Sequence, residues 1–79
     1  MNQLPTQQEL DHQTAITWIT TELQIFAQNV GQRNAASAVL SVLNLATVLR
    51  LVSLDEKQAF AEEINRITEA HFHSLRVVA

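Results

Sequence analysis

The chain has 79 residues, a formal net charge of −3 and no cysteine. Without cysteine it has no disulfide framework, no thiol nucleophile and no Cys-ligated metal site, and its single glycine argues against a Gly-rich phosphate loop. Only five Lys and Arg residues in an acidic chain argue against a dedicated nucleic-acid binder.

The length predicts a single helical domain over residues 1–79 and limits its stability. Hydrophobic residues make up 47% of the chain, a normal globular share, so a folded protein is expected. A domain of this size buries only about 60–65% of the surface that its unfolded chain exposes. With no disulfide and no obvious metal site, oligomerisation is the expected supplement.

The first residues, MNQLPTQQELD, contain neither a basic n-region nor an apolar h-region. We therefore expect no signal peptide, and the absence of cysteine adds to the expectation of a cytoplasmic location.

The first helix is predicted at about residues 7–29. Thr6 and Glu9 form a capping-box pattern after an extended lead-in at residues 1–5, and Gly31 suits the left-handed position just past a helix end. Apolar residues recur at the three- and four-residue spacing of one helical face, at Ile16, Ile19, Leu23, Phe26 and Val30.

Two further helices follow, at about residues 35–51 and 54–76. Asn34 can cap the second, and Ser53 with Glu56 forms a capping box for the third. The core stripe of the third helix is predicted to contain Phe60, Ile64, Ile67 and His71, followed by Leu75 or Val78. No period-two run is bounded by turn residues, so the predicted fold class is an all-α, up-down-up three-helix bundle.

The second helix predicts a homodimer. No charged residue lies between Arg33 and Arg50, and a helix that is apolar nearly all round must be covered nearly all round. We expect it to pack on its symmetry mate, and the candidate dimer-interface residues are Leu40, Leu43, Val48 and Leu51. The alternatives are a compact monomer and a membrane span, although the uncharged run is shorter than about 20 residues and contains Asn44.

Trp18 and Ile25 lie seven residues apart, on a face of the first helix that points away from its main apolar stripe. They form either a second contact surface, for a partner protein or for the other protomer, or part of a wide core face, with the edge of Trp18 lying over the rim of the bundle. Together with residues elsewhere in the chain they make up the partner-binding candidates, Trp18, Ile25, Arg33, Phe72 and Arg76.

The histidines give no metal motif. His71 and His73 are two apart on one helix and point to opposite sides, and His12 is predicted to lie near Glu56 at the start of the third helix, far from His71. No Ser or Thr lies in a glycine elbow, and the adjacent carboxylates point about 100° apart. We therefore predict no enzyme, no catalytic or metal-binding residue, no cofactor and no small-molecule substrate.

The segment FAQNVGQRNAASAVL resembles a helix-turn-helix core, with Ala27 four residues before Gly31 and apolar Val30 between them. The resemblance implies a dimeric DNA-binding transcriptional regulator. The segment departs from the motif at Gln32 and Ser37, where apolar residues are expected, and the would-be recognition helix has almost no base-reading side chains.

The leading functional hypothesis is a small non-enzymatic protein–protein interaction module. Such a protein acts by occupying a partner's surface, as an adaptor, regulator, chaperone-like subunit or inhibitor. Inhibitors of host systems encoded by phages or mobile elements fall in this class. The dimeric DNA-binding regulator is the alternative, and a membrane partner is not expected.

Overall fold

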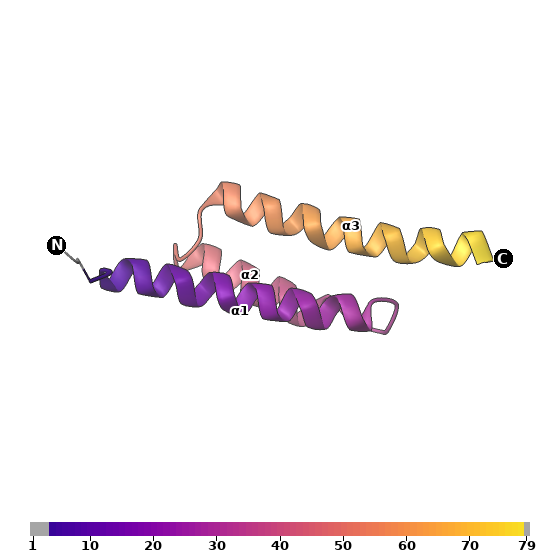
Figure 1. Cartoon of the computed structure of the whole chain (residues 1–79), viewed down its shortest axis with the longest axis horizontal. Helices are drawn as coiled ribbons and strands as arrows, with labels where there is room; N and C mark the ends of the chain where they lie inside the picture. Colours follow the sequence, from indigo (N-terminus) through magenta and orange to yellow (C-terminus); the bar gives the residue numbers. More distant parts are fainter. Residues whose placement is uncertain (1–3, 79) are drawn as a thin grey trace.

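The computed structural model describes the backbone of residues 4–78 and the side chains of residues 4–76. Over this range the chain has three helices, α1 (Gln7–Asn29), α2 (Ser37–Val48) and α3 (Leu54–Val78), and no strand. α1 and α2 form an antiparallel pair, and α3 returns beside them parallel to α1 (Figure 1). The all-helical fold and the up-down-up course of the chain are therefore confirmed. Residues 1–3 of the predicted lead-in lie outside the described part of the chain.

Both predicted capping boxes are present. The Glu9 N–H donates to the Thr6 hydroxyl at 3.1 Å, and the Thr6 N–H donates to the Glu9 carboxylate at 3.4 Å. At the start of α3, the Glu56 N–H donates to the Ser53 hydroxyl at 3.1 Å and the Ser53 N–H donates to the Glu56 carboxylate at 2.8 Å. Each box satisfies backbone donors that have no partner within the helix.

The turn after α1 depends on its glycine, as predicted. Gly31 has a φ of +97°, a conformation that side chains with a Cβ rarely adopt. The ring of His71, from α3, lies against Gly31 so closely that a Cβ built on this glycine would be 2.5 Å from the His71 Nε2 atom. The contact places the C-terminal part of α3 over the turn between α1 and α2.

α2 is shorter than the predicted helix over residues 35–51, and Asn34 is not its cap. Asn34 has a φ of +61° within the preceding turns, and the residue before α2 is Ala36, which makes no side-chain cap hydrogen bond. At the other end, Arg50 adopts the left-handed conformation that a glycine usually fills. Its N–H donates to the Thr47 carbonyl and the Leu51 N–H to that of Ala46, the pair of bonds that closes a Schellman motif.

The core is small and entirely apolar. All of its fully buried residues are hydrophobic, and the described part of the chain has no buried polar side chain. Six of the eight buried residues come from α1 and α2, one from the α2–α3 connection and one from α3, in chain order Ala15, Ile19, Phe26, Val39, Leu43, Ala46, Val52 and Ile64.

α3 packs on this core through part of its predicted stripe. Ile64 is buried, and Phe60 and Ile67 pack against the core, whereas Leu75 is about half exposed. Leu75 was predicted as a core position because its helical spacing is right, but it belongs to the C-terminal part of α3, which runs past the α1–α2 turn (Figure 1). Val78, the other predicted end of the stripe, lies outside the described side chains.

The molecule is elongated. Its radius of gyration is 15.2 Å, against about 12 Å for a compact domain of this length, and its extents are 59 × 26 × 19 Å. None of the helices in residues 4–78 combines the length and the apolar character that a membrane crossing requires.

The Gly31–His71 contact gives a first test of the fold. Gly31→Ala should lower the free energy of unfolding by about 1–2 kcal/mol, because it adds left-handed strain and displaces the His71 ring. In a His71→Ala background the same change should cost less, since only the strain remains. Urea denaturation of the wild type, the two single variants and the double variant measures the free-energy cost of Gly31→Ala in each background. Equal costs in the two backgrounds would contradict the contact.

Candidate interaction surfaces

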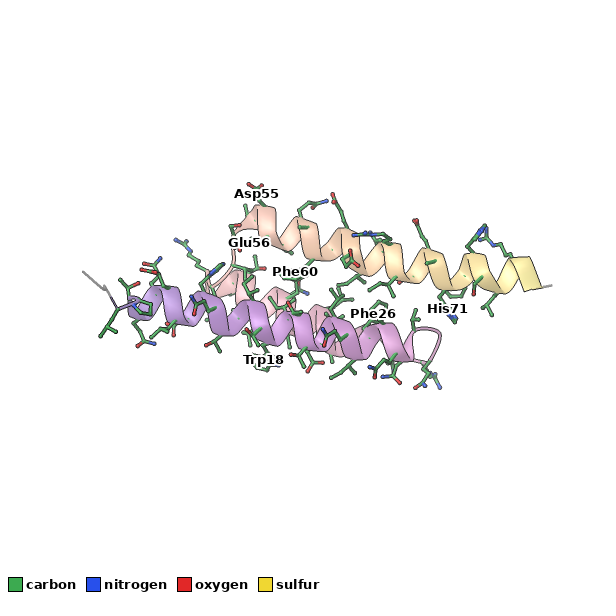
Figure 2. The ribbon with its side chains drawn as sticks, in the orientation of Figure 1. Trp18, Phe26, Asp55, Glu56, Phe60 and His71 are labelled. Atoms are coloured by element: carbon green, nitrogen blue, oxygen red, sulfur yellow. The ribbon has the colours of Figure 1, made fainter. Side chains whose placement is uncertain are left out.

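The first surface is an apolar groove between α1 and α2, which we call the Trp18 face and which is lined by Trp18, Val42, Leu45 and Leu49. The groove has a volume of about 240 Å³, and Ala15, Ala46 and Leu51 complete most of its floor. Trp18, Leu45 and Leu49 are each 52–57% exposed. Trp18 projects from the side of the α1–α2 pair that faces away from α3 (Figure 2).

Helical spacing explains why α2 presents this face. Val42, Leu45 and Leu49 are three and four residues apart and therefore share one side of the helix. An adjoining side, about 90° round the helix, is used by Val39 and Leu43, which are buried in the core of the same chain. An all-apolar helix that α1 and α3 cover only in part thus leaves its remaining leucines in solvent.

The second surface is the end of α3, residues 72–78, which we call the α3 overhang. It extends about two turns past the α1–α2 turn (Figure 1). Phe72 is about half exposed, as Leu75 is, and Phe72, His73 and Arg76 line a shallow depression on this helix together with Arg66 and Glu69.

The partner-binding candidates fall into separate places. Trp18 and Ile25 are both about half exposed, so neither is buried in the core. Phe72 and Arg76 lie one turn apart on the α3 overhang. Arg33 is exposed in the turn between α1 and α2, and these five residues do not form one continuous site.

The dimer-interface candidates are also divided. Leu43 is only 1% exposed and packs in the core of its own chain, so it has no surface to offer a second copy. Leu51 is half-buried against the same core. Leu40 and Val48 are exposed, Val48 at 76%, and remain available.

Leu45 and Leu49 were not among the candidates chosen from the sequence. The sequence does contain a pattern that identifies them. Val42, Leu45 and Leu49 are three and four residues apart and therefore form one apolar stripe on a helix. What the spacing does not reveal is the neighbour: Trp18 joins this stripe only because α1 and α2 pack as an antiparallel pair (Figure 1).

A polar contact ties the start of α3 to α1. His12 Nε2 lies 2.7 Å from a carboxylate oxygen of Glu56, as the sequence predicted, and because an ionised carboxylate only accepts, the imidazole N–H donates. The Ser53 N–H, and after it the His12 side chain, lower the pKa of Glu56 below its ordinary value of 4.5. Among the described residues, no three His, Asp or Glu side chains are placed to hold a metal ion.

The other ion pair lies within α3. Arg66 pairs with Glu63, one turn before it, rather than with Glu62, which accepts a hydrogen bond from Gln58. Exposed pairs of this kind contribute a few tenths of a kcal/mol to helix stability. They leave Arg33 and Arg76 without a recorded carboxylate contact in the described part of the chain.

The helix-turn-helix resemblance gains no support from this geometry. That motif joins two helices at about 90–120°, whereas α1 and α2 run side by side in opposite directions (Figure 1). The exposed side of α2 also carries no charged residue that would contact a phosphate.

No protein-family model matches this chain, and no curated protein or solved structure matches it. What the protein does must therefore follow from its own surfaces.

The lowered pKa of Glu56 predicts a pH dependence of stability. The folded-state pKa lies below the unfolded one, so the stabilisation is fully present above the unfolded pKa and is lost as the pH falls through the folded value. Glu56→Gln keeps an oxygen for the Ser53 N–H but cannot titrate. It should therefore be less stable than the wild type at pH 7, and the difference should shrink steadily below pH about 4.5.

Urea denaturation at a series of pH values measures this difference. Glu9→Gln is the matched control, because Glu9 occupies the same capping-box position in α1 without a histidine contact. A Glu56→Gln difference that stays constant from pH 7 to pH 3 would contradict the assignment.

Proposed function

We propose that the protein is a small non-enzymatic interaction module that acts by covering a surface of a partner protein, as an adaptor, regulator, chaperone-like subunit or inhibitor. One observation carries the proposal. The folded chain exposes 6212 Å², whereas a folded monomer of 8.9 kDa is expected to expose about 4,800 Å². The excess is about 1,400 Å², and large apolar side chains are exposed on both the Trp18 face and the α3 overhang, among them Trp18, Leu45, Leu49, Phe72 and Leu75.

A second copy of the chain is the first partner in this proposal, with α2 in the interface. A stable interface of standard size buries about 800 Å² on each partner, which is less than the excess surface of one protomer. A homodimer would therefore supplement the small core and still leave surface for another protein.

The α3 overhang is the surface proposed for that other protein. Phe72 supplies an aromatic anchor and Arg76, one turn on, a cation at its edge, and both residue types are enriched in protein–protein interfaces. Ile25 and Arg33 are the further exposed candidates on α1 and the α1–α2 turn.

Light scattering coupled to size exclusion tests the homodimer. Over a hundredfold range of concentration, about 1 to 100 μM, the mass should correspond to two chains at the upper end, because exposed apolar surface of this extent favours association. A single-chain mass at every concentration would remove the homodimer from the proposal.

Capture from a lysate of the native host tests the other surface. Immobilised wild type should retain a discrete protein that Phe72→Ala retains at least about tenfold less well, since truncating a hot-spot aromatic costs 2 kcal/mol or more. Leu10→Ala, at an exposed leucine near the start of α1, is the matched control and should retain it fully. Identical retention by all three proteins would exclude Phe72 as an anchor.

A further inference from the structure

We infer that the Trp18 face is the docking site for a second copy of this chain, with the Trp18 side chain of each copy seated in the groove of the other. The inference rests on the proposed function and deepens it, because it assigns one of the two exposed surfaces to self-association. Four properties of the groove support this occupant.

The size and lining of the groove suit a side chain rather than a small ligand. Its volume of about 240 Å³ lies below the 300–1,000 Å³ typical of small-molecule pockets. Its lining is apolar apart from Asp11 and Thr14, both from the N-terminal half of α1. A buried indole ring can fill such a groove, and its N–H needs an acceptor, which the Asp11 or Thr14 side chain in the lining offers.

The charge pattern favours a copy of the same chain. In a twofold dimer each protomer presents the same patch, so a charged centre would bring like charges together. The Trp18 face avoids this cost, because α2 has no charged residue and Asp11 is the one charged residue that lines the groove. The α3 overhang differs, since Arg66, Glu69 and Arg76 all line its depression.

The apolar surface continues beyond the groove. Val48 lies one turn after Leu45 and is 76% exposed, and Ile25 extends the exposed stripe of α1 by two turns from Trp18. The two stripes belong to adjacent, antiparallel helices (Figure 1). A second α1–α2 pair laid across them would cover both stripes at once.

The excess surface of the whole chain is larger than what one stable interface needs. Each chain exposes about 1,400 Å² more than a compact monomer of its mass, and a standard interface needs about 800 Å² from each partner. Trp18 would contribute most per residue, because a buried aromatic side chain removes 150–250 Å² from water.

Trp18 itself reports on the inference. It is the only tryptophan, and the chain has no tyrosine, so fluorescence excited at 295 nm comes from this one position. On dilution of the wild type, Trp18 emission should shift to the red as the ring returns to water, with a midpoint that matches dissociation measured by light scattering. Dissociation without a change in Trp18 emission would overturn the inference.

Two matched substitutions locate the interface. Leu45→Glu and Leu75→Glu each place a carboxylate at a leucine that is 53% exposed, the first in the groove and the second on the α3 overhang. Leu45→Glu should raise the dimer dissociation constant about a hundredfold or more, whereas Leu75→Glu should change it less than about threefold. Circular dichroism checks that both variants keep their helices. The wild-type fluorescence dilution decides the question by itself if Leu45→Glu does not fold.

The outcomes separate this inference from the proposed function. A wild-type dimer that Leu45→Glu leaves intact overturns the Trp18 assignment but keeps the homodimer, which then uses another face of α2. A wild type that is monomeric at 100 μM overturns the assignment and the homodimer together. In that case the capture experiment with Phe72→Ala alone decides whether the protein is an interaction module.

Discussion

The antiparallel contact between α1 and α2 is the interaction on which the rest of the structure depends. It supplies six of the eight buried side chains, with Ile19, Val39 and Leu43 as its most completely buried members. Because the hydrophobic stabilisation of a fold scales with the apolar area removed from water, most of the packing energy of this chain lies between these two helices. α3 adds one buried residue, Ile64, and is therefore held largely at the edge of a two-helix core.

Two contacts outside the buried core, one at the start of α3 and one at the α1–α2 turn, position α3 on the other two helices. Near its start, the Glu56 carboxylate accepts one hydrogen bond from the Ser53 N–H, which completes the capping box, and another from His12 of α1. Over the α1–α2 turn, the His71 ring lies against Gly31, a position where the absence of a side chain allows the close approach. These contacts fix the direction of α3 more than they add to its stability, since exposed hydrogen bonds and ion pairs contribute little free energy.

The same arrangement explains why so much apolar surface remains exposed. A short helix without charges is covered by α1 and α3 on only part of its surface, and a long helix runs past the end of the pair on which it packs (Figure 1). Neither feature helps an isolated chain, because exposed leucine, valine and aromatic side chains lose the burial that would stabilise them. Both features are favourable for a protein whose surfaces are completed by other chains, and this is the physical basis for assigning one face to a second copy and the other to a partner.

The sequence by itself determined the local structure of α1 and of the start of α3, but not the ends of α2. Helix starts at Thr6 and Ser53, the glycine turn at Gly31 and the His12–Glu56 contact all follow from short-range patterns and from helix direction. Tertiary structure decided which apolar residues are buried. Leu43 and Leu45 have the same side chain on one uncharged helix, yet the first is in the core and the second lines the groove beside Trp18. Periodicity shows that a helix has an apolar side, but when nearly every side is apolar, only the position of the neighbouring helix selects the one that is covered.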